Sequence, residues 1–230
     1  MKNKIQIFLD GADQESIKKY KSTVDGFTFN PSLFRKLNAK NYIEFSKKII
    51  KLCEDKHISL EVIADDERNI IRQAKKLSSL GENIYVKVPI VYTNGKSTKN
   101  AIKKLIKLNI KLNITAIFTV QQIKAILPYI KKTNTILSVF AGRIFDLGID
   151  ATKVCEIISR ICKPTKCILL WASPRMSYDI INAKKSNFDI ITLPVEIYKK
   201  TKLFNKKPFD YSVDTVKMFY NDAKKAKYTL

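Results

Sequence analysis

One lysine lies inside a stretch that predicts a β-strand. Lys87 falls within residues 84–90, between β-branched neighbours, and a proline follows two positions later. A charge in such a setting is costly unless it is paired or its pKa falls. A desolvated lysine with a lowered pKa attacks carbonyl carbons, which is the first step towards a Schiff base. The alternative interpretation is a strand-end lysine that points at water, as on many edge strands.

Polar residues recur at the ends of the other expected strands. Strand patterns occupy residues 5–10, 26–29, 59–63, 84–88, 111–116, 135–140, 167–172 and 189–193. Each polar residue on its own has a structural explanation, such as a helix cap or an Asx turn. Together, on neighbouring strands, they would be unfavourable in a packed interior unless they satisfy one another around a site. They are Asp10, Thr28, Asn30, Glu61, Lys87, Asn113, Thr115, Ser138, Arg143, Ser173 and Arg175.

These residue types suit carbon–carbon bond chemistry. Lys87 would attack a ketone, and Asp10 would take a proton from a substrate hydroxyl as the bond breaks. The protonated imine would accept the electrons of the resulting carbanion. Glu61 and Thr115 could hold a water that shuttles protons during imine formation.

The remaining polar residues suit a sugar phosphate. Asn30 and Asn113 could hydrogen-bond the hydroxyls of a sugar-like chain. Arg143 and Arg175, with Ser173, offer a fork-shaped site for a phosphate.

The elements that would position this site alternate along the whole chain. Amphipathic helical patterns at 42–52, 69–80, 98–108, 120–130 and 151–161 separate the strands. Eight strand–helix units in 230 residues predict one (β/α)₈ barrel over residues 1–230, with an additional C-terminal helix at about 212–226. A doubly wound open sheet is the competitor, but no G-x-G-x-x-G follows the first strand.

The chain resembles the transaldolase family, especially its short members, which include fructose-6-phosphate aldolase-like enzymes. The matching stretches cover almost the whole chain, in order. They are residues 8–10, 24–33, 86–89, 112–118, 140–144, 172–175 and 191–194.

The resemblance implies a role for each residue. Lys87 would form the imine, Asp10 would be the acid/base at the carbon–carbon bond, and Glu61 and Thr115 would position a water. Asn30, Asn113 and Ser138 would contact the dihydroxyacetone portion. The phosphate would bind Arg143, Ser173 and Arg175, and the predicted substrate-binding set also includes Thr28 and Phe140.

Two residues favour transfer over release within the family. In the aldolase branch the positions of Glu61 and Phe140 look like glutamine and tyrosine, so the resemblance implies transfer of a three-carbon unit between sugar phosphates, with no metal and no organic cofactor. The resemblance also implies a role in carbohydrate metabolism, in the pentose phosphate pathway. A fructose-6-phosphate aldolase-like lyase and a catalytically inactive barrel that acts as a binding protein stay open. Phe29 and Gly11 depart from the family pattern, and a Phe29 that pointed inward would shrink the sugar pocket.

Charge and composition limit the kinds of partner that the protein is expected to have. The formal net charge is +22, but the lysines are spread over every expected helix, which argues against a specific nucleic-acid function. A positive field would instead concentrate a phosphorylated substrate.

No apolar run is long enough to span a membrane, and no signal segment is seen at the N-terminus, so we expect a cytoplasmic protein with four reduced cysteines. We also expect a homo-oligomer, because in short family members the C-terminal helix reaches over a neighbouring subunit.

Overall fold

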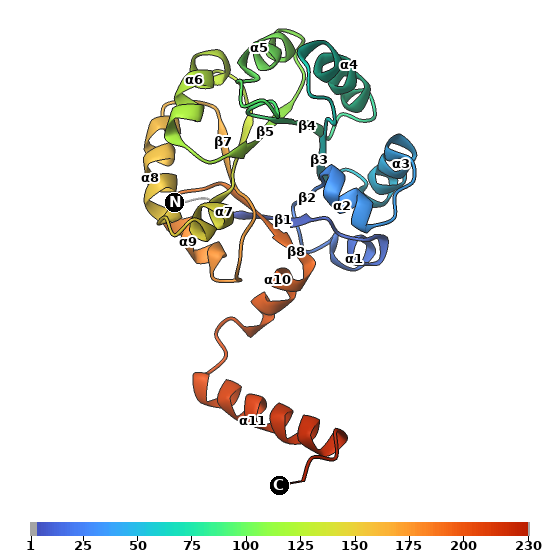
Figure 1. Cartoon of the computed structure of the whole chain (residues 1–230), viewed down its shortest axis with the longest axis vertical. Helices are drawn as coiled ribbons and strands as arrows, with labels where there is room; N and C mark the ends of the chain where they lie inside the picture. Colours follow the sequence, from blue (N-terminus) through green and yellow to red (C-terminus); the bar gives the residue numbers. More distant parts are fainter. Residues whose placement is uncertain (1–3, 230) are drawn as a thin grey trace. The chain divides into compact units, whose positions relative to one another are not determined.

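A ring of eight parallel strands forms the centre of the protein. In the computed structural model, which describes residues 4–229, the strands pair in chain order and the last pairs with the first, so the barrel is closed. The helices that alternate with the strands lie around this ring (Figure 1). The predicted (β/α)₈ barrel is therefore confirmed, and an open sheet is excluded. Residues 1 and 230, the expected limits of the domain, lie outside the described range.

The strands and helices alternate from the first strand to the last. The strands are β1 (Gln6–Asp10), β2 (Gly26–Thr28), β3 (His57–Glu61), β4 (Ile84–Pro89), β5 (Leu112–Ile117), β6 (Ile136–Val139), β7 (Ile168–Trp171) and β8 (Ile190–Pro194). The helices are α1 (Gln14–Tyr20), α2 (Pro31–Lys36), α3 (Tyr42–Cys53), α4 (Glu67–Ser78), α5 (Lys99–Lys107), α6 (Val120–Ile130), α7 (Ala141–Asp146), α8 (Ala151–Cys162), α9 (Asp179–Lys185) and α10 (Val195–Lys200).

All eight strands lie within about two residues of their predicted positions. The five long barrel helices were also visible as 3.6-residue patterns in the sequence. The short helices α1, α2, α7 and α9 were not, since six or seven residues span too few turns to display a periodicity.

Side chains alternate between two environments along each strand. Leu9, Val86 and Val88 belong to the large core between the strands and the helices. A smaller cluster that includes Phe8 fills the inside of the barrel below the site. Gly26 makes room for Phe8, because a Cβ at this position would lie 2.9 Å from the phenyl ring. The interior is thus apolar at the N-terminal ends of the strands and polar at their C-terminal ends.

The chain divides into two units by its internal contacts, one ending at Tyr198 and the other beginning at Lys199. The second unit contains a short 3₁₀ turn (Thr201–Leu203) and the long helix α11 (Pro208–Lys225), which confirms the predicted C-terminal helix. Pro208 starts α11 at a position where its missing N–H costs no helical hydrogen bond. Within the described residues, no helix combines the length and the apolar character that a membrane crossing requires.

Candidate active site

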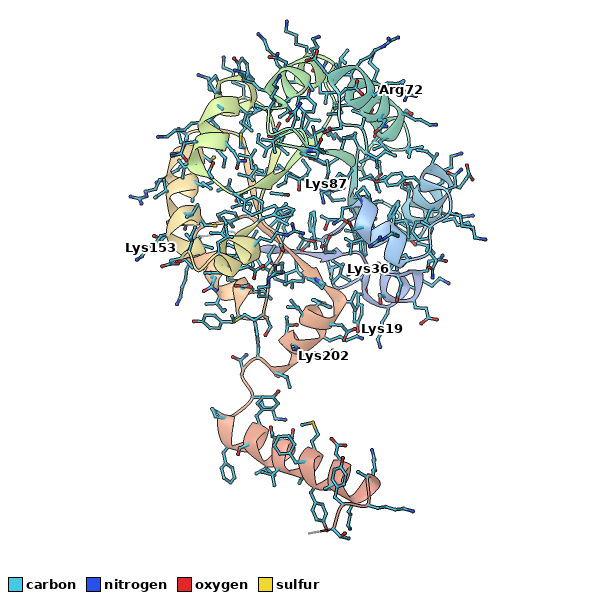
Figure 2. All side chains as sticks on the ribbon, viewed as in Figure 1. Lys19, Lys36, Arg72, Lys87, Lys153 and Lys202 are labelled. Atoms are coloured by element: carbon cyan, nitrogen blue, oxygen red, sulfur yellow. The ribbon has the colours of Figure 1, made fainter. Side chains whose placement is uncertain are left out.

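Lys87 lies inside the barrel with its charge paired. It is 5% exposed, and it is the only buried lysine or arginine among residues 4–229. Strands β3 and β4 place it directly beside Glu61, and Lys87 Nζ lies 3.3 Å from Glu61 Oε2. Figure 2 shows Lys87 within the ring of strands, whereas Arg72 and Lys153 point outward from the helices. The edge-strand alternative is therefore excluded for this lysine.

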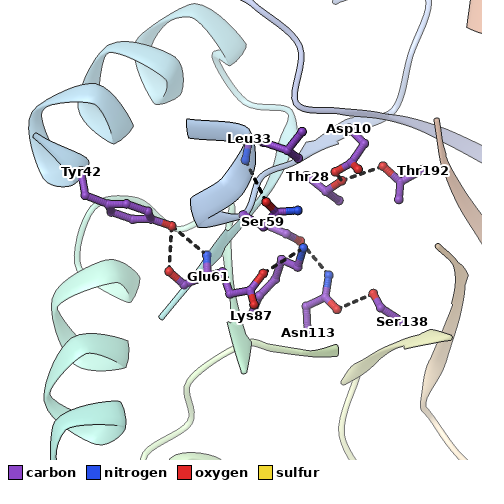
Figure 3. A network of polar contacts seen from close by, with 11 residues as sticks. Asp10, Thr28, Leu33, Tyr42, Ser59, Glu61, Lys87, Asn113, Ser138 and Thr192 are labelled. Atoms are coloured by element: carbon purple, nitrogen blue, oxygen red, sulfur yellow. Dashed lines mark hydrogen bonds and ion pairs between the residues drawn. The ribbon is translucent and has the colours of Figure 1, made fainter. Parts of the chain in front are cut away.

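A tyrosine fixes the backbone of Glu61. The Tyr42 hydroxyl donates to Glu61 O at 2.7 Å and accepts from Glu61 N at 3.1 Å (Figure 3). Glu61 is the last residue of β3, where the ladder ends, so the tyrosine holds the strand end that aims the carboxylate at Lys87.

Asp10 occupies the neighbouring part of the cavity. It ends β1, and its Oδ1 accepts a hydrogen bond from the Thr28 hydroxyl at 2.6 Å. Burial raises the pKa of Asp10, while the charge of Lys87 and the Thr28 hydrogen bond oppose that rise. A carboxyl group with a raised pKa is better suited to accept and return a proton than an ordinary one.

Lys87 lines a cavity of about 110 Å³ at the C-terminal ends of the strands. Nine of the twelve predicted site residues line it, and they come from strands β1, β2, β4, β5 and β6 and from the segments that follow β2, β6 and β7. They are Asp10, Thr28, Asn30, Lys87, Thr115, Ser138, Phe140, Arg143 and Ser173. Ala172 and Thr192 also line the cavity.

Thr115 presents a hydroxyl without a partner. Its Oγ1 is buried and makes no hydrogen bond within the described part of the chain. The following residue, Ala116, has a φ of +58°, and the pairing of β5 with β6 is irregular at this point. A buried hydroxyl with no partner needs a water or a ligand group, and the cavity provides the space for one.

Asn113 lies beneath the cavity. It is fully buried, its Oδ1 accepts from the Ser138 hydroxyl at 2.6 Å, and its Nδ2 donates to Ser59 at 3.0 Å. Because Ser138 gives its only hydroxyl hydrogen to Asn113, it faces the cavity as an acceptor. Asn113 thus orients Ser138. Asn113 itself is not one of the residues that line the cavity.

Asn30 serves the fold and the cavity together. Its Oδ1 caps α2 by accepting from Leu33 N at 2.9 Å, which explains the Asn-Pro pair at this helix start. The cap fixes the amide so that Nδ2 is the group left to donate to a ligand.

The arginines occupy different places at the rim. Arg143 lines the cavity, with its guanidinium 5.5 Å from the centre of the Phe140 ring. Arg175 does not line the cavity. Its Nε donates to Asp146 Oδ1 at 2.9 Å, its Nη2 bonds the other carboxylate oxygen, and its Nη1 donates to Ser173 Oγ at 3.3 Å.

Close backbone contacts shape the rim segment that carries Ser173 and Arg175. A Cβ on Gly142 would lie 1.7 Å from Ser173 O, so only glycine allows α7 to approach this segment. The buried carboxylate of Asp179 accepts from the backbone N–H of Arg175 at 2.7 Å and of Met176 at 3.2 Å.

The two residues that depart from the family pattern leave the cavity open. Phe29 points away from the cavity and packs on Phe34, with ring centres 5.4 Å apart. Gly11 has a φ of +64°, and a Cβ there would lie 2.5 Å from Leu33. A threonine at position 11 would therefore be strained in this chain.

Burial keeps two thiols and His57 in their neutral forms. All four thiols are free, and burial raises the pKa of Cys53 and of Cys162 to about 12, so neither is a thiolate at neutral pH. Burial lowers the pKa of His57 to about 3. Among the described residues, no three His, Cys, Asp or Glu side chains gather in an arrangement that could hold a metal ion.

The fold and the site together define a (β/α)₈ barrel with a buried amine that is paired with Glu61 in a cavity that Asp10 also lines. Comparison with known proteins gives the family. Residues 7–230 match the family Transaldolase/Fructose-6-phosphate aldolase. A probable transaldolase of Methanococcus vannielii is 33% identical over 216 residues, 91% of this chain and 94% of that protein. A probable transaldolase of Nitrosopumilus maritimus is 36% identical over 203 residues, 85% of this chain and 86% of that protein.

Solved structures support the fold. A native KDPGal structure aligns with a TM-score of 0.56 at 11% identity, over 85% of this chain and 84% of that one. Orotidine 5′-monophosphate decarboxylase from Metallosphaera sedula aligns with a TM-score of 0.55 at 11% identity, over 93% and 97%. The chain belongs to the transaldolase/fructose-6-phosphate aldolase family, and it is an enzyme of that family.

The sequence interpretation missed several residues that position the site. They are Tyr42, Ser59, Asp146, Asp179 and Thr192. Strand periodicity could have found Ser59, which lies two residues before Glu61 and so on the same face of β3. Thr192 was part of a matching stretch, but nothing in the sequence connects it to Asp10.

Proposed function

We propose that this enzyme transfers a three-carbon dihydroxyacetone unit between sugar phosphates through a Schiff base on Lys87. The observation that carries the proposal is the position of the Lys87 amine, buried at the cavity and paired with Glu61 at 3.3 Å. An amine must lose its proton before it attacks a ketone, and Glu61 lies where it could accept that proton. Asp10 lines the same cavity.

The proposed reaction begins with the ketone. Lys87 Nζ adds to the carbonyl carbon, and the carbonyl oxygen leaves as water, which the unpartnered Thr115 hydroxyl could hold. Asp10 then removes the proton of the hydroxyl on the carbon beyond the breaking bond. The electrons of that bond move to the imine, so an aldehyde leaves and an enamine stays on Lys87.

Transfer follows when the enamine meets a second aldehyde. The enamine carbon attacks the new carbonyl, Asp10 returns its proton to the oxygen that forms, and water releases the new ketose from Lys87. Phe140 favours this path over release of free dihydroxyacetone, because its ring lines the cavity without a hydroxyl that could help to protonate the enamine.

Arg143 and Ser173 are the groups that we propose for the substrate phosphate, with Arg175 at the rim. Arg143 and Ser173 line the cavity, and a charged, planar donor beside a hydroxyl suits a phosphate. We also propose that the enzyme is a homo-oligomer. Helix α11 supports this, because Phe209, Val216 and Phe219 on it are 62–77% exposed, and analytical ultracentrifugation tests it.

The proposed function is tested by product analysis with and without an acceptor. Fructose 6-phosphate alone should give no more than one equivalent of aldehyde per active site, and an added aldose phosphate should restore turnover. Continuous release of dihydroxyacetone without an acceptor would instead favour the lyase. No aldehyde under either condition, with a folded protein, would favour the inactive binding protein.

A further inference from the structure

Thr192 lies at the wall of the cavity in contact with the partner of Asp10. It is on β8, is 4% exposed and lines the cavity. Its Oγ1 is 2.7 Å from Thr28 Oγ1, and Thr28 Oγ1 is 2.6 Å from Asp10 Oδ1. Figure 3 shows the three side chains close together, and they come from β1 and from the strands β8 and β2 on either side of it.

The direction of these hydrogen bonds follows from counting hydrogens. An ionised carboxylate can only accept, and each threonine hydroxyl has one hydrogen to donate. Thr28 therefore donates its hydrogen to Asp10. In the contact between the two threonines, Thr192 is the donor and Thr28 Oγ1 is the acceptor. A hydroxyl that accepts one hydrogen bond is a stronger donor in the next one.

We propose that Thr192 is a positioning residue that orients the Thr28 hydroxyl towards Asp10 and strengthens its hydrogen bond to the carboxylate. This inference rests on the proposed function, in which Asp10 removes and returns the proton of the substrate. Thr192 acts on Asp10 only through Thr28.

The hydrogen-bonded pair stabilises one state of Asp10 more than the other. When Asp10 takes a proton on Oδ2, Thr28 still donates to Oδ1, but to a neutral and weaker acceptor. The loss of the Thr192 hydroxyl thus destabilises the ionised state of Asp10 more than its protonated state. Lys87 on β4 also favours the ionised state, and Arg143 and Asn30 line the same cavity. Without Thr192 the acid limb of the rate of bond cleavage should move to higher pH.

The chain contains a matched control for this pair. Thr133 and Thr135 form a second contact between threonine hydroxyls, partly buried and also at 2.7 Å. Thr135 is 2% exposed and lies immediately before β6, away from the residues that line the cavity. Thr135→Val removes the same type of hydrogen bond without touching Asp10.

The test compares Thr192→Val, Thr192→Ser and Thr135→Val with the unmodified enzyme. Two quantities are measured: the pH profile of kcat for cleavage of fructose 6-phosphate with an acceptor, and borohydride trapping of the imine from dihydroxyacetone. Thr192→Val should lower kcat by about tenfold and move its acid limb up by about half a pH unit. It should leave imine trapping and KM near their original values.

The serine variant should restore the acid limb, and Thr135→Val should leave it in place. If Thr192→Val does not fold, Thr192→Ala removes the same hydroxyl. An unchanged acid limb, or a change confined to KM, would overturn the inference, since the latter would make Thr192 a direct substrate contact. An unmodified enzyme that traps no imine would instead refute the proposed function.

Discussion

Arg175 is bound to Asp146 through two guanidinium nitrogens, with Nε 2.9 Å from Asp146 Oδ1. The pair lies at the rim of the cavity, and a third nitrogen reaches Ser173, which lines it. The Arg175 hydrogen bond holds the pKa of Asp146 below its ordinary value, so the carboxylate stays charged. Arginine has five N–H groups, so two of them are left to meet a phosphate in a fixed orientation.

Asp146→Asn should therefore weaken the binding of phosphorylated substrates. The amide cannot form the same two-point contact, and the arginine regains the rotamer freedom that a phosphate would then have to restrict. We expect KM for fructose 6-phosphate to rise about three- to tenfold, with little change in imine trapping from dihydroxyacetone.

Glu67→Gln is the control for this variant, because it breaks an exposed ion pair with Lys104 on helices α4 and α5. A lower KM in Asp146→Asn would contradict the prediction, since it would mean that Asp146 competes with the phosphate for Arg175.

Asp10→Asn should separate stability from activity. Burial raises the pKa of Asp10, so the folded state binds the proton more tightly than the unfolded state. Its contribution to stability is therefore greatest below the unfolded pKa and is lost as pH rises through the folded pKa. At neutral pH the buried charge is unfavourable, and the neutral asparagine should raise Tm.

The same variant should lose bond cleavage while keeping imine formation. Removing a general base lowers such rates by about 10²- to 10⁴-fold. Thermal unfolding at pH 7 and borohydride trapping with dihydroxyacetone check the two halves. A fall in Tm would contradict the first half, since it would show that the charge of Asp10 stabilises the folded protein.

Much of the barrel and of the site follows from local patterns in the sequence. Glu61 ends β3 and Lys87 lies near the end of β4. Side chains alternate between two faces along each strand, and parallel pairing brings these two positions side by side. Asn113 obeys the same alternation, but its depth below Ser138 depends on the stagger of the strands around the barrel. No local pattern carries that information.

Arg175 was predicted to bind the substrate phosphate because its loop follows a strand. Its actual place depends on Asp146, which lies 29 positions away in the sequence and has no distinguishing neighbours. Thr28 was predicted as a substrate contact, and the hydrogen bond that connects it to Asp10 also crosses between strands. Pairs of this kind become visible only when the barrel is closed.

Tyr42→Phe should loosen the Glu61–Lys87 pair. The variant removes both hydrogen bonds that hold the backbone of Glu61, at about 1 kcal/mol each. We expect the free energy of unfolding to fall by about 1–2 kcal/mol, and imine formation to slow because Glu61 is held less firmly beside the amine. Urea unfolding and the rate of borohydride trapping measure these effects.

Tyr198→Phe is the matched control, because the Tyr198 hydroxyl bonds Thr23 on the outside of the barrel. Equal trapping rates in the two variants would show that Tyr42 does not affect imine formation and has a structural role only.

The most direct test of the central claim is to find the adduct itself. Borohydride is added to the enzyme with fructose 6-phosphate, and intact mass and peptide mapping locate the product. The account predicts one stable adduct per chain, on Lys87, and none in Lys87→Ala. An adduct on an exposed lysine, or no adduct with a folded enzyme, would contradict it.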